Sequence, residues 1–202
     1  MEPIAISLGL CETDTNISLA QFAHAAYGCD SCGLGERSGQ ADWGYNAIAN
    51  GGNQEGLWRT LSSSEWKYLL ETRDTKAGIR YAKAIVNDVN GLILFPDEWD
   101  PTLFHIENAN DPSSHNHPNT ISVEDWDRVF EPSGAIFLPA GGITKHREPW
   151  WEINGNYGTY WSASRCTSWL CLQMVFDDWL LVPEHGWYPH SRAAVRLVRD
   201  KE

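Results

Sequence analysis

The chain lacks any long hydrophobic run and any cluster of basic residues. No stretch approaches the roughly 20 apolar residues of a membrane-spanning helix, and the first residues, MEPIAISLGL, lack the positively charged segment of a secretory signal. We therefore expect a soluble protein without membrane insertion, either intracellular or displayed on a cell or virion surface by another route. The formal net charge of -12 repels phosphate groups and anionic lipid, so we expect no nucleic acid partner.

Cysteine is scarce, and the number of cysteines is odd: Cys11, Cys29, Cys32, Cys166 and Cys171. A chain of this size does not depend on disulfides, so reduced thiols are the simplest interpretation. The Cys29-x-x-Cys32 pair is compatible with half a zinc site, a redox pair or two free thiols. Zinc would need two more ligands, for which Cys11 and His24 are the near candidates, and a lone pair of this kind is a weak signal.

Catalytic motifs are also missing. The sequence contains no Ser/His/Asp order, phosphate-binding loop, HExxH motif or obvious pair of carboxylates. His115-x-His117 lies among Ser, Asn and Pro in a polar stretch, residues 100–119, that indicates a solvated loop rather than a metal site. We therefore expect neither an enzyme nor a cofactor or resident metal.

Tryptophan, in contrast, is abundant, with 11 residues in a chain of 202. Trp packs in cores and is enriched at binding hot spots, so the excess predicts both an aromatic core and aromatic anchors at a surface. Hydrophobic residues make up 42% and charged residues 21% of the chain, which are ordinary values for one globular domain.

Two helices with capping signals are expected in the middle of the chain. Ser62 and Glu65 form a capping box that opens the first, with Trp66, Leu69 and Leu70 to bury. The second runs from a Ser122 cap to Phe130, and its expected buried residues are Val123, Trp126, Val129 and Phe130. A further helix, capped by Ser18 and ended by Gly28, is expected within residues 1–40.

Strand patterns lie between and after these helices. Residues 81–86 and 92–95 read as a hairpin with its turn at Asn90-Gly91, and residues 135–138 read as a further strand closed by Pro139. The flanks of the last stretch, residues 160–164 and 194–199, alternate as half-buried strands do. Short helices, a hairpin and strands crowded at the end predict an α+β domain rather than an alternating βαβ one.

Between those last flanks the sequence is too varied and too aromatic for a simple connection. If residues 170–176 formed a packed strand, Leu170, Leu172, Met174 and Phe176 would face the core and leave Cys171, Gln173 and Val175 outside. We accept core positions for Met174 and Phe176. For the aromatic and basic residues of this span we favour surface display, because hot spots are built from Trp, Tyr and Arg.

Several sequence segments resemble those of a known protein family: ADWGYNAIANGG, GLWRTLSSSEWKYLLETR, RYAKAIVNDVNGLILFPDEW, GAIFLPAGG, and YWSAS with VRLVRD at the end. In this order they resemble C-type-lectin-fold proteins of the Fibrobacter major paralogous domain type, common in gut bacterial surface proteins. The resemblance implies two helices, a twisted antiparallel sheet and a small second sheet that carries the ligand site. Residues 41–202 would form this ligand-binding domain, and residues 1–40 an extension packed on it.

The same fold is used by variable proteins of diversity-generating retroelements, in which an error-prone reverse transcriptase randomises side chains on the C-terminal strands, and this chain resembles them. The resemblance implies a monomeric display protein whose surface, about residues 165–192, binds varied protein or glycan ligands. The candidate ligand-binding residues are Arg165, Cys166, Thr167, Trp169, Leu170, Leu172, Gln173, Asp178, Trp179, His185, Trp187, Tyr188, His190 and Arg192.

Three alternatives remain. Formylglycine-generating enzymes also resemble this fold and bind copper through two cysteines five apart, the spacing of Cys166 and Cys171, although the Gly-Gly-Ser phrase of those enzymes is missing here. A structural domain of a surface adhesin is the second. A calcium-dependent lectin is the third and is disfavoured. Glu148-Pro149-Trp150 and Glu131-Pro132-Ser133 lack the amide of the Glu-Pro-Asn triplet of those lectins, and Trp161-Ser162-Ala163 lacks both oxygen donors of their Trp-Asn-Asp motif. Asp177 and Asp178 read as a solvated edge rather than a cation site.

Overall fold

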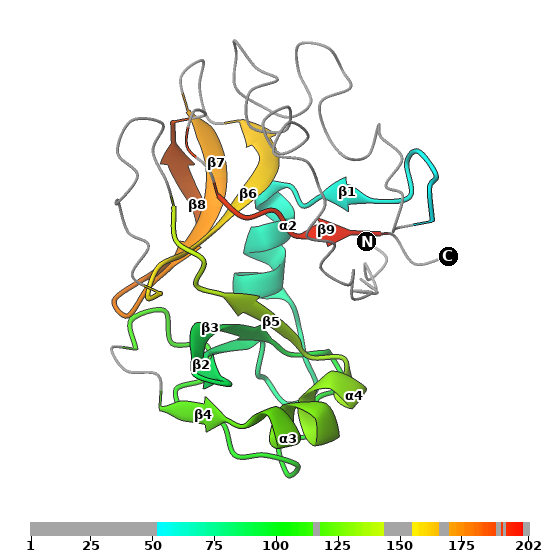
Figure 1. Ribbon diagram of the computed structural model, residues 1–202, viewed down its shortest axis with the longest axis vertical. Coiled ribbons are helices and arrows are strands. Elements are labelled where there is room, and N and C mark those ends of the chain that lie inside the picture. The colour runs from blue at the N-terminus through cyan, green and yellow to red at the C-terminus, as the bar shows by residue number, and fades with distance from the viewer. Residues whose placement is uncertain are drawn as a thin grey trace.

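The computed structural model describes residues 52–114, 118–143, 155–165, 170–188, 191 and 193–199. In chain order its elements are β1 (Arg59–Thr60), α2 (Ser63–Lys67), the π-helical turn η3 (Tyr68–Thr72), β2 (Tyr81–Val86), β3 (Val89–Leu94), β4 (Asn119–Ile121), α3 (Val123–Asp125), the π-helical turn η4 (Trp126–Phe130), α4 (Glu131–Ser133), β5 (Ile136–Pro139), β6 (Gly158–Arg165), β7 (Cys171–Phe176), β8 (Leu181–Trp187) and β9 (Leu197–Val198). Mixed sheets and short helices confirm the α+β class (Figure 1). The helix expected after Ser18 and the Cys29/Cys32 pair lie outside the described residues.

The strands form a four-stranded sheet in the order β4-β2-β3-β5, a three-stranded sheet in the order β6-β7-β8, and the pair β1-β9. All pairs are antiparallel except β2 with β4. The pairing of β1 with β9 joins the first described strand to the last, where the Arg199 guanidinium lies 5.7 Å from the centre of the Trp58 ring.

The first helix begins as the sequence predicts. The Ser62 hydroxyl accepts a hydrogen bond from the Glu65 backbone N–H at 3.2 Å, and the Glu65 carboxylate accepts one from the Ser62 N–H at 2.8 Å. This capping box satisfies two N–H groups that have no partner within the helix. The helix continues as η3, and its residues Trp66, Leu69 and Leu70 are buried as expected.

The hairpin β2-β3 is present, but its turn is not at Asn90-Gly91. Val86 pairs with Val89, so the two turn residues are Asn87 and Asp88, with φ of 48° and 62°. Asn and Asp tolerate this left-handed conformation, and a two-residue hairpin turn requires it at both positions. Gly91 instead pairs with Pro139 of β5, where a Cβ atom would lie 2.3 Å from the Phe137 ring. Glycine at position 91 therefore allows close packing against the Phe137 ring and does not form a turn.

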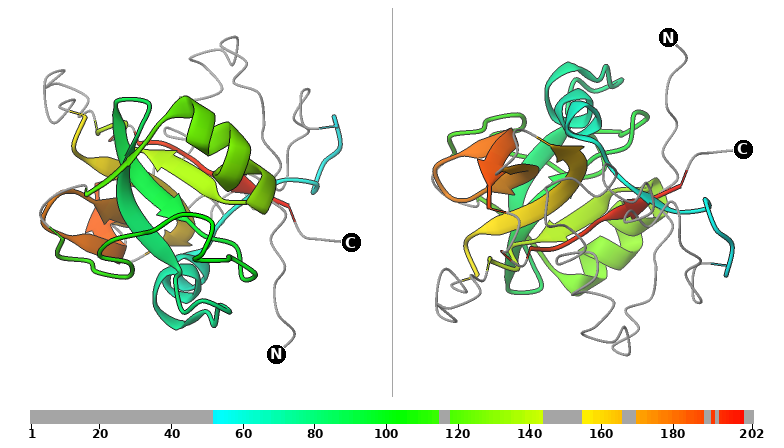
Figure 2. Two further views of the ribbon diagram at one scale, coloured as in Figure 1. Left: turned by 90° about the horizontal axis from the view of Figure 1, so that it is seen from below. Right: turned by 90° about the horizontal axis from the view of Figure 1, so that it is seen from above.

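The two faces of the four-stranded sheet are both covered. On one face Tyr81, Leu92, Leu94, Ile136 and Leu138 pack against α2, η3 and the C-terminal sheet. On the other, Ala82, Ala84 and Ile93 pack against Phe130 and its aromatic neighbours. Figure 2 shows α2 and the α3–α4 segment on opposite sides of the molecule, which agrees with these two separate cores.

Phe130 is the centre of the second core. Its ring lies 5.3 Å from Trp99, 5.5 Å from Trp126 and 5.1 Å from Phe104, measured between ring centroids. These contacts confirm the predicted aromatic core. The helix that carries Phe130 begins at the predicted Ser122 cap, whose hydroxyl accepts from the Asp125 N–H at 3.0 Å. Val123, however, lies in the first turn of the helix and is exposed rather than buried.

Candidate functional site

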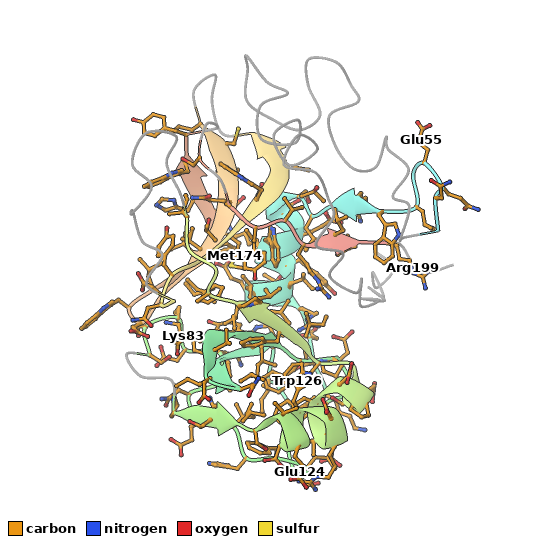
Figure 3. All side chains as sticks on the ribbon, in the orientation of Figure 1. Glu55, Lys83, Glu124, Trp126, Met174 and Arg199 are labelled. Carbon is orange, nitrogen blue, oxygen red and sulfur yellow. The ribbon has the colours of Figure 1, made fainter. Side chains whose placement is uncertain are left out.

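Those predicted recognition residues that the structure describes lie on and around the sheet β6-β7-β8. One face of this sheet is closed: Met174 and Phe176 are fully buried with Tyr160 and Leu181 against α2, which confirms their predicted core positions. Met174 is labelled in Figure 3. Dispersion and apolar burial therefore fix the sheet from this side. The sequence pattern predicts strands at the flanks of this region and allows a packed strand over residues 170–176, but it does not predict β8.

The opposite face is also largely covered. Trp161, Cys171 and Ala193 form a small cluster with the half-buried Trp187 and Val195. The segment around Ala194 lies beside β6, since the Trp161 N–H donates to the Ala194 carbonyl at 2.9 Å and the Ala194 N–H to the Thr159 carbonyl at 3.1 Å. β7 is thus a central strand with both faces packed.

Gln173 lies on this covered face. Its predicted position on the ligand-binding surface is therefore wrong. Its side chain is 0% exposed, and its Oε1 accepts a 2.8 Å hydrogen bond from the Thr159 hydroxyl. Its Nε2, like the Nδ1 of the cross-strand neighbour His185, is buried and has no hydrogen-bond partner within the described ranges. Cys171 and Val175 are buried as well, so alternation with an outward-facing set does not describe this strand.

Where β6 ends, its ladder with β7 is interrupted. Trp161 pairs with Gln173 and Arg165 with Cys171, so β6 holds extra residues between these pairs. Two serine side chains form hydrogen bonds with backbone groups where the ladder is interrupted. The Ser162 hydroxyl donates to the Leu172 carbonyl at 2.8 Å, and the Ser164 hydroxyl accepts from the Ser63 N–H at 3.0 Å. The bulge lies at the end of β6 that precedes the predicted recognition span, and the Ser63–Ser164 bond ties this end to the start of α2.

The turn between β7 and β8 is organised by Asp177. One of its carboxylate oxygens accepts hydrogen bonds from the backbone N–H groups of Trp179 at 2.6 Å and Leu180 at 2.9 Å. The Asp177 N–H donates to the Leu180 carbonyl at 3.0 Å. On this turn Asp178 is half-buried, and the Trp179 side chain is 68% exposed.

A second group of predicted residues lies at the other end of β8. Trp187 pairs with Cys171, which in turn pairs with Arg165, so Leu170, Trp187 and Tyr188 share this end with the backbone of Arg165. Tyr188 is 53% exposed, while the Trp187 indole donates to the Ser191 hydroxyl at 2.9 Å. His185 and Leu172 are half-buried nearby. The remaining candidates, Cys166, Thr167, Trp169, His190 and Arg192, and the side chain of Arg165, lie outside the described residues.

The predicted set is therefore divided by the length of β8. At about 3.3 Å per residue this strand separates Trp179 from Tyr188 by roughly 20 Å or more. We call Asp178 with Trp179 the turn group, and Leu170 with Trp187 and Tyr188 the end group.

The outer edge of β8 is unsuited to strand addition. Gln173 pairs with His185 but Val175 pairs with Val182, so Pro183 and Glu184 bulge from the ladder. Pro183 has no N–H to donate, and Glu184 carries an exposed charge within 3.4 Å of Lys67. Proline, bulges and charge are the usual protections of an edge strand, so any recognition here proceeds through side chains.

No metal centre is formed by the described part of the chain, which contains no grouping of three or more His, Cys, Asp or Glu side chains placed to hold an ion. The Cys171 side chain is buried. No helix within the described ranges is long and apolar enough to cross a membrane.

Lys83 is a residue that sequence reasoning missed. It lies on β2, on the face that carries Tyr81, and is 2% exposed. Burial lowers the pKa of its ammonium, while the nearby carboxylates of Asp177 and Asp178 act in the opposite direction. A single lysine in the otherwise apolar strand YAKAIV is the signal that could have identified it.

No family model matches the chain, and no curated protein or solved structure matches it either.

Proposed function

We propose that the chain is a ligand-binding display protein with a C-type lectin fold, and that a retroelement diversifies its C-terminal surface. The domain of residues 41–202 would act as a monomer, without catalysis or cofactor, and bind protein or glycan ligands. The resemblance of its phrases to lectin-fold variable proteins supports this proposal. So does the combination of an α2-backed sheet, β6-β7-β8, with a separate four-stranded sheet.

The observation that carries the proposal is the exposure of Trp179 and Tyr188. Among the Phe, Tyr and Trp residues of the described ranges, these two alone are classed as exposed, and both belong to the span assigned to recognition. Large aromatic side chains left in water are favoured anchors for a partner, since each supplies a wide contact area at low entropic cost.

The buried face of the sheet β6-β7-β8 supports the proposal that exposed residues can be substituted without loss of the fold. Met174 and Phe176 seal one side of β7, while Trp179 and Tyr188 flank the edge strand β8. Substitution of the exposed residues would leave the buried contacts in place. A rigid scaffold with replaceable surface side chains is what a diversified binding protein requires.

The distance between the turn group and the end group indicates how large a ligand must be to contact both. A standard protein interface buries about 800 Å² per partner, which corresponds to a patch roughly 30 Å across. One protein ligand can therefore cover both the turn group and the end group along β8. A single sugar residue reaches only one of them, so we favour a protein ligand over a short glycan.

The test is a binding screen of the immobilised protein against a glycan array and a panel of purified surface proteins. We expect the immobilised wild-type protein to bind at least one protein of the panel. Trp179→Ala and Tyr188→Ala should each weaken the affinity for that ligand at least about tenfold, as loss of a hot-spot residue does. The matched control is Leu103→Ala, since Leu103 is 54% exposed but lies outside the span. Equal effects of all three variants, or binding that survives both aromatic substitutions, would refute the proposed surface.

A further inference from the structure

Gln173 and His185 place two buried nitrogen atoms at neighbouring positions of the sheet β6-β7-β8. The two residues are directly opposite each other in the antiparallel ladder of β7 and β8, where facing side chains have Cβ atoms about 4.5 to 5.5 Å apart. The Gln173 Nε2 and the His185 Nδ1 are both buried, and neither has a hydrogen-bond partner within the described ranges. Since buried polar groups are nearly always bonded, this pair indicates a second state in which the two side chains bond to each other.

The other end of the Gln173 amide is bound to Thr159 of β6. The Thr159 hydroxyl donates to the Gln173 Oε1 at 2.8 Å, but a hydroxyl can also accept, so it can hold the amide in either of two orientations. In the first, Oε1 bonds to Thr159 and Nε2 is left for β8, because β7 lies between β6 and β8. In the second, Nε2 donates to the Thr159 oxygen and Oε1 is left for β8. Gln173 can therefore offer His185 either a donor or an acceptor and keep its bond to Thr159.

The protonation state of His185 determines which orientation is satisfied. A neutral imidazole carries one N–H, which can be on Nε2 and leave Nδ1 without need of an acceptor. The imidazolium carries an N–H on both nitrogens, and a buried N–H without an acceptor is costly. With the amide turned over, the Gln173 Oε1 supplies that acceptor. Histidine is the side chain that ordinarily changes its charge between pH 5 and pH 8, so acid favours the second orientation.

The neighbouring groups leave the titration in this pH range to the imidazole. On β8 the preceding carboxylate, Glu184, lies 3.4 Å from the ammonium of Lys67 on α2. On β7 the titratable residue on the same face is Cys171, and thiols ordinarily ionise above about pH 8. The described residues of the covering segment, 191–195, carry no charge.

Two further sets of charges lie at the ends of the sheet. Asp177 and Asp178 are on the β7–β8 turn, at the opposite end of β8 from Trp187. Arg165, whose side chain lies outside the described residues, pairs with Cys171 at the near end, and a guanidinium keeps its charge at any pH between 5 and 8. A change of charge next to Trp187 in this range is therefore assigned to His185.

Trp187 transmits the change to the end group. The centre of the His185 ring lies 5.5 Å from that of the Trp187 ring, within the distance at which a cation is attracted to an aromatic face. The Trp187 indole donates to the Ser191 hydroxyl at 2.9 Å, and its ring meets the exposed Tyr188 edge-on at 6.5 Å. A proton on His185 thus adds a positive charge beside the aromatic pair that forms this end of the recognition surface.

We propose that His185 is a pH-sensitive switch of the end group. At pH 5 a proton from solvent adds to the imidazole, the Gln173 Oε1 accepts from the new Nδ1–H, Nε2 donates to the Thr159 hydroxyl, and the imidazolium stays against Trp187. At pH 8 the ring is neutral, and the amide is held by Thr159 alone. A difference in ligand affinity between the two pH values rests on the proposed function, whereas the switch itself does not.

The test is a ligand-free titration of the full chain, labelled with 5-fluorotryptophan and nitrogen-15, from pH 8 to pH 5. Trp187→Phe identifies the fluorine resonance of Trp187. We expect this resonance and the side-chain amide signals of Gln173 to move together in one step. His185→Gln should abolish the step in the Trp187 resonance, whereas the control His105→Gln, at an exposed position outside the sheet, should retain it.

Gln173→Met distinguishes the switch from simple titration of an imidazole near Trp187. Met has a similar length but offers no oxygen to the Nδ1–H, so the Trp187 step should require a lower pH than in wild type. A step at the same pH in Gln173→Met and wild type would overturn the proposal. Persistence of the step in His185→Gln would overturn it as well.

The wild-type spectra decide the question if either variant fails to fold. The side-chain amide of Gln173 can be assigned by correlation with its own backbone, without a substitution. Amide signals that stay constant from pH 8 to pH 5 refute the proposal, and signals that move with the Trp187 resonance support it. Because no ligand is added, failure of the binding screen does not affect these results.

Discussion

The Tyr160 hydroxyl donates a 2.9 Å hydrogen bond to the Pro139 carbonyl, and so joins the first strand of the C-terminal sheet to the last residue of β5. Tyr160 also stacks against Phe176, with centroids 6.4 Å apart. The sheet that carries the proposed recognition surface is therefore tied to the four-stranded sheet by a buried phenol. Burial raises the pKa of Tyr160 above its usual value, and raises that of Tyr81 in the same core to about 12.

These raised pKa values predict alkaline unfolding. In the unfolded chain a tyrosine ionises near pH 10, so the stability that the two neutral phenols contribute is fully present below about pH 10. It is lost as the pH rises toward the folded pKa of about 12 for Tyr81. Urea unfolding at pH 8 and pH 11 should show a clear fall in the free energy of unfolding.

Single substitutions isolate this effect from other titrations. Tyr160→Phe should cost about 1 kcal/mol at pH 8 through the lost hydrogen bond, and should reduce the further loss between pH 8 and pH 11. Tyr188→Phe, at an exposed tyrosine, should keep the wild-type pH dependence. The same alkaline loss in all three proteins would show that the buried phenols are not its cause.

The capping box predicts acid sensitivity of α2. Burial alone would raise the pKa of the Glu65 carboxyl, but hydrogen bonds from Arg59 and Ser62 outweigh it and hold the pKa below its usual value. The resulting stability is present above the unfolded pKa of about 4.3 and is lost as the pH falls through the folded value. Ser62→Ala should lower the free energy of unfolding at neutral pH by about 1 kcal/mol.

Calorimetry at pH 7 and pH 3 tests this assignment. The gap between wild type and Glu65→Gln should be larger at pH 7 than at pH 3, because the stability contributed by the charged carboxylate begins to be lost once the pH falls below the unfolded pKa of about 4.3. Glu71→Gln, which changes an exposed carboxyl on η3, is the control and should show little pH-dependent difference from wild type. A gap that stays constant with pH would contradict the role of the Glu65 charge.

Gly91 predicts a steric effect. A methyl group there would meet the Phe137 ring at 2.3 Å and the Leu138 carbonyl oxygen at 2.6 Å, and the rigid ladder with β5 leaves little room to adjust. Gly91→Ala should destabilise by about 1 to 3 kcal/mol or more, as overpacking does. Gly141→Ala is the control, since nothing lies within 4 Å of its added Cβ. Thermal unfolding of the two variants should differ by several degrees, and equal melting temperatures would be inconsistent with the packing described.

The buried pair Thr159–Gln173 predicts an unusual stability response. Gln173→Leu alone leaves the Thr159 hydroxyl without its acceptor and should destabilise by about 1 kcal/mol. The same substitution removes the buried Gln173 Nε2, which has no hydrogen-bond partner among the described residues. Adding Thr159→Val then replaces the second polar partner with an apolar group. We expect the double variant to be at least as stable as wild type in urea unfolding. A double variant weaker than the single one would mean that Gln173 makes a contact beyond Thr159.

The sequence predicts features that depend on local chemistry. The Ser62 and Ser122 caps and the first arm of the hairpin follow from residues close together in the chain, and the structure confirms them. The turn prediction failed because Asn90-Gly91 and Asn87-Asp88 are both good turn sequences. Only the close approach of Phe137, which is distant in sequence, assigns Gly91 to the strand.

Non-local packing also explains the misplaced site residue. Gln173 has the polarity of a surface residue, but the chain near Ala194 lies along β6 and helps to cover that face. Lys83 likewise has the charge of an exposed residue, and its partners at Pro112 and Ser114 cannot be read from the strand itself. Trp179 and Tyr188 are exposed as predicted, while their role in recognition remains a prediction.

The most direct test of the central claim is to sequence the 3′ end of this gene from many cells, together with its genomic neighbourhood. The account predicts that codons for Trp179, Tyr188 and the other exposed candidates vary between cells. The variable sites should read adenine in a nearby near-copy beside a reverse transcriptase gene, and codons for the buried Met174 and Phe176 should stay constant. An invariant span with no near-copy would contradict the account, and Cu(I) titration of Cys166 and Cys171 would then test the oxidase alternative.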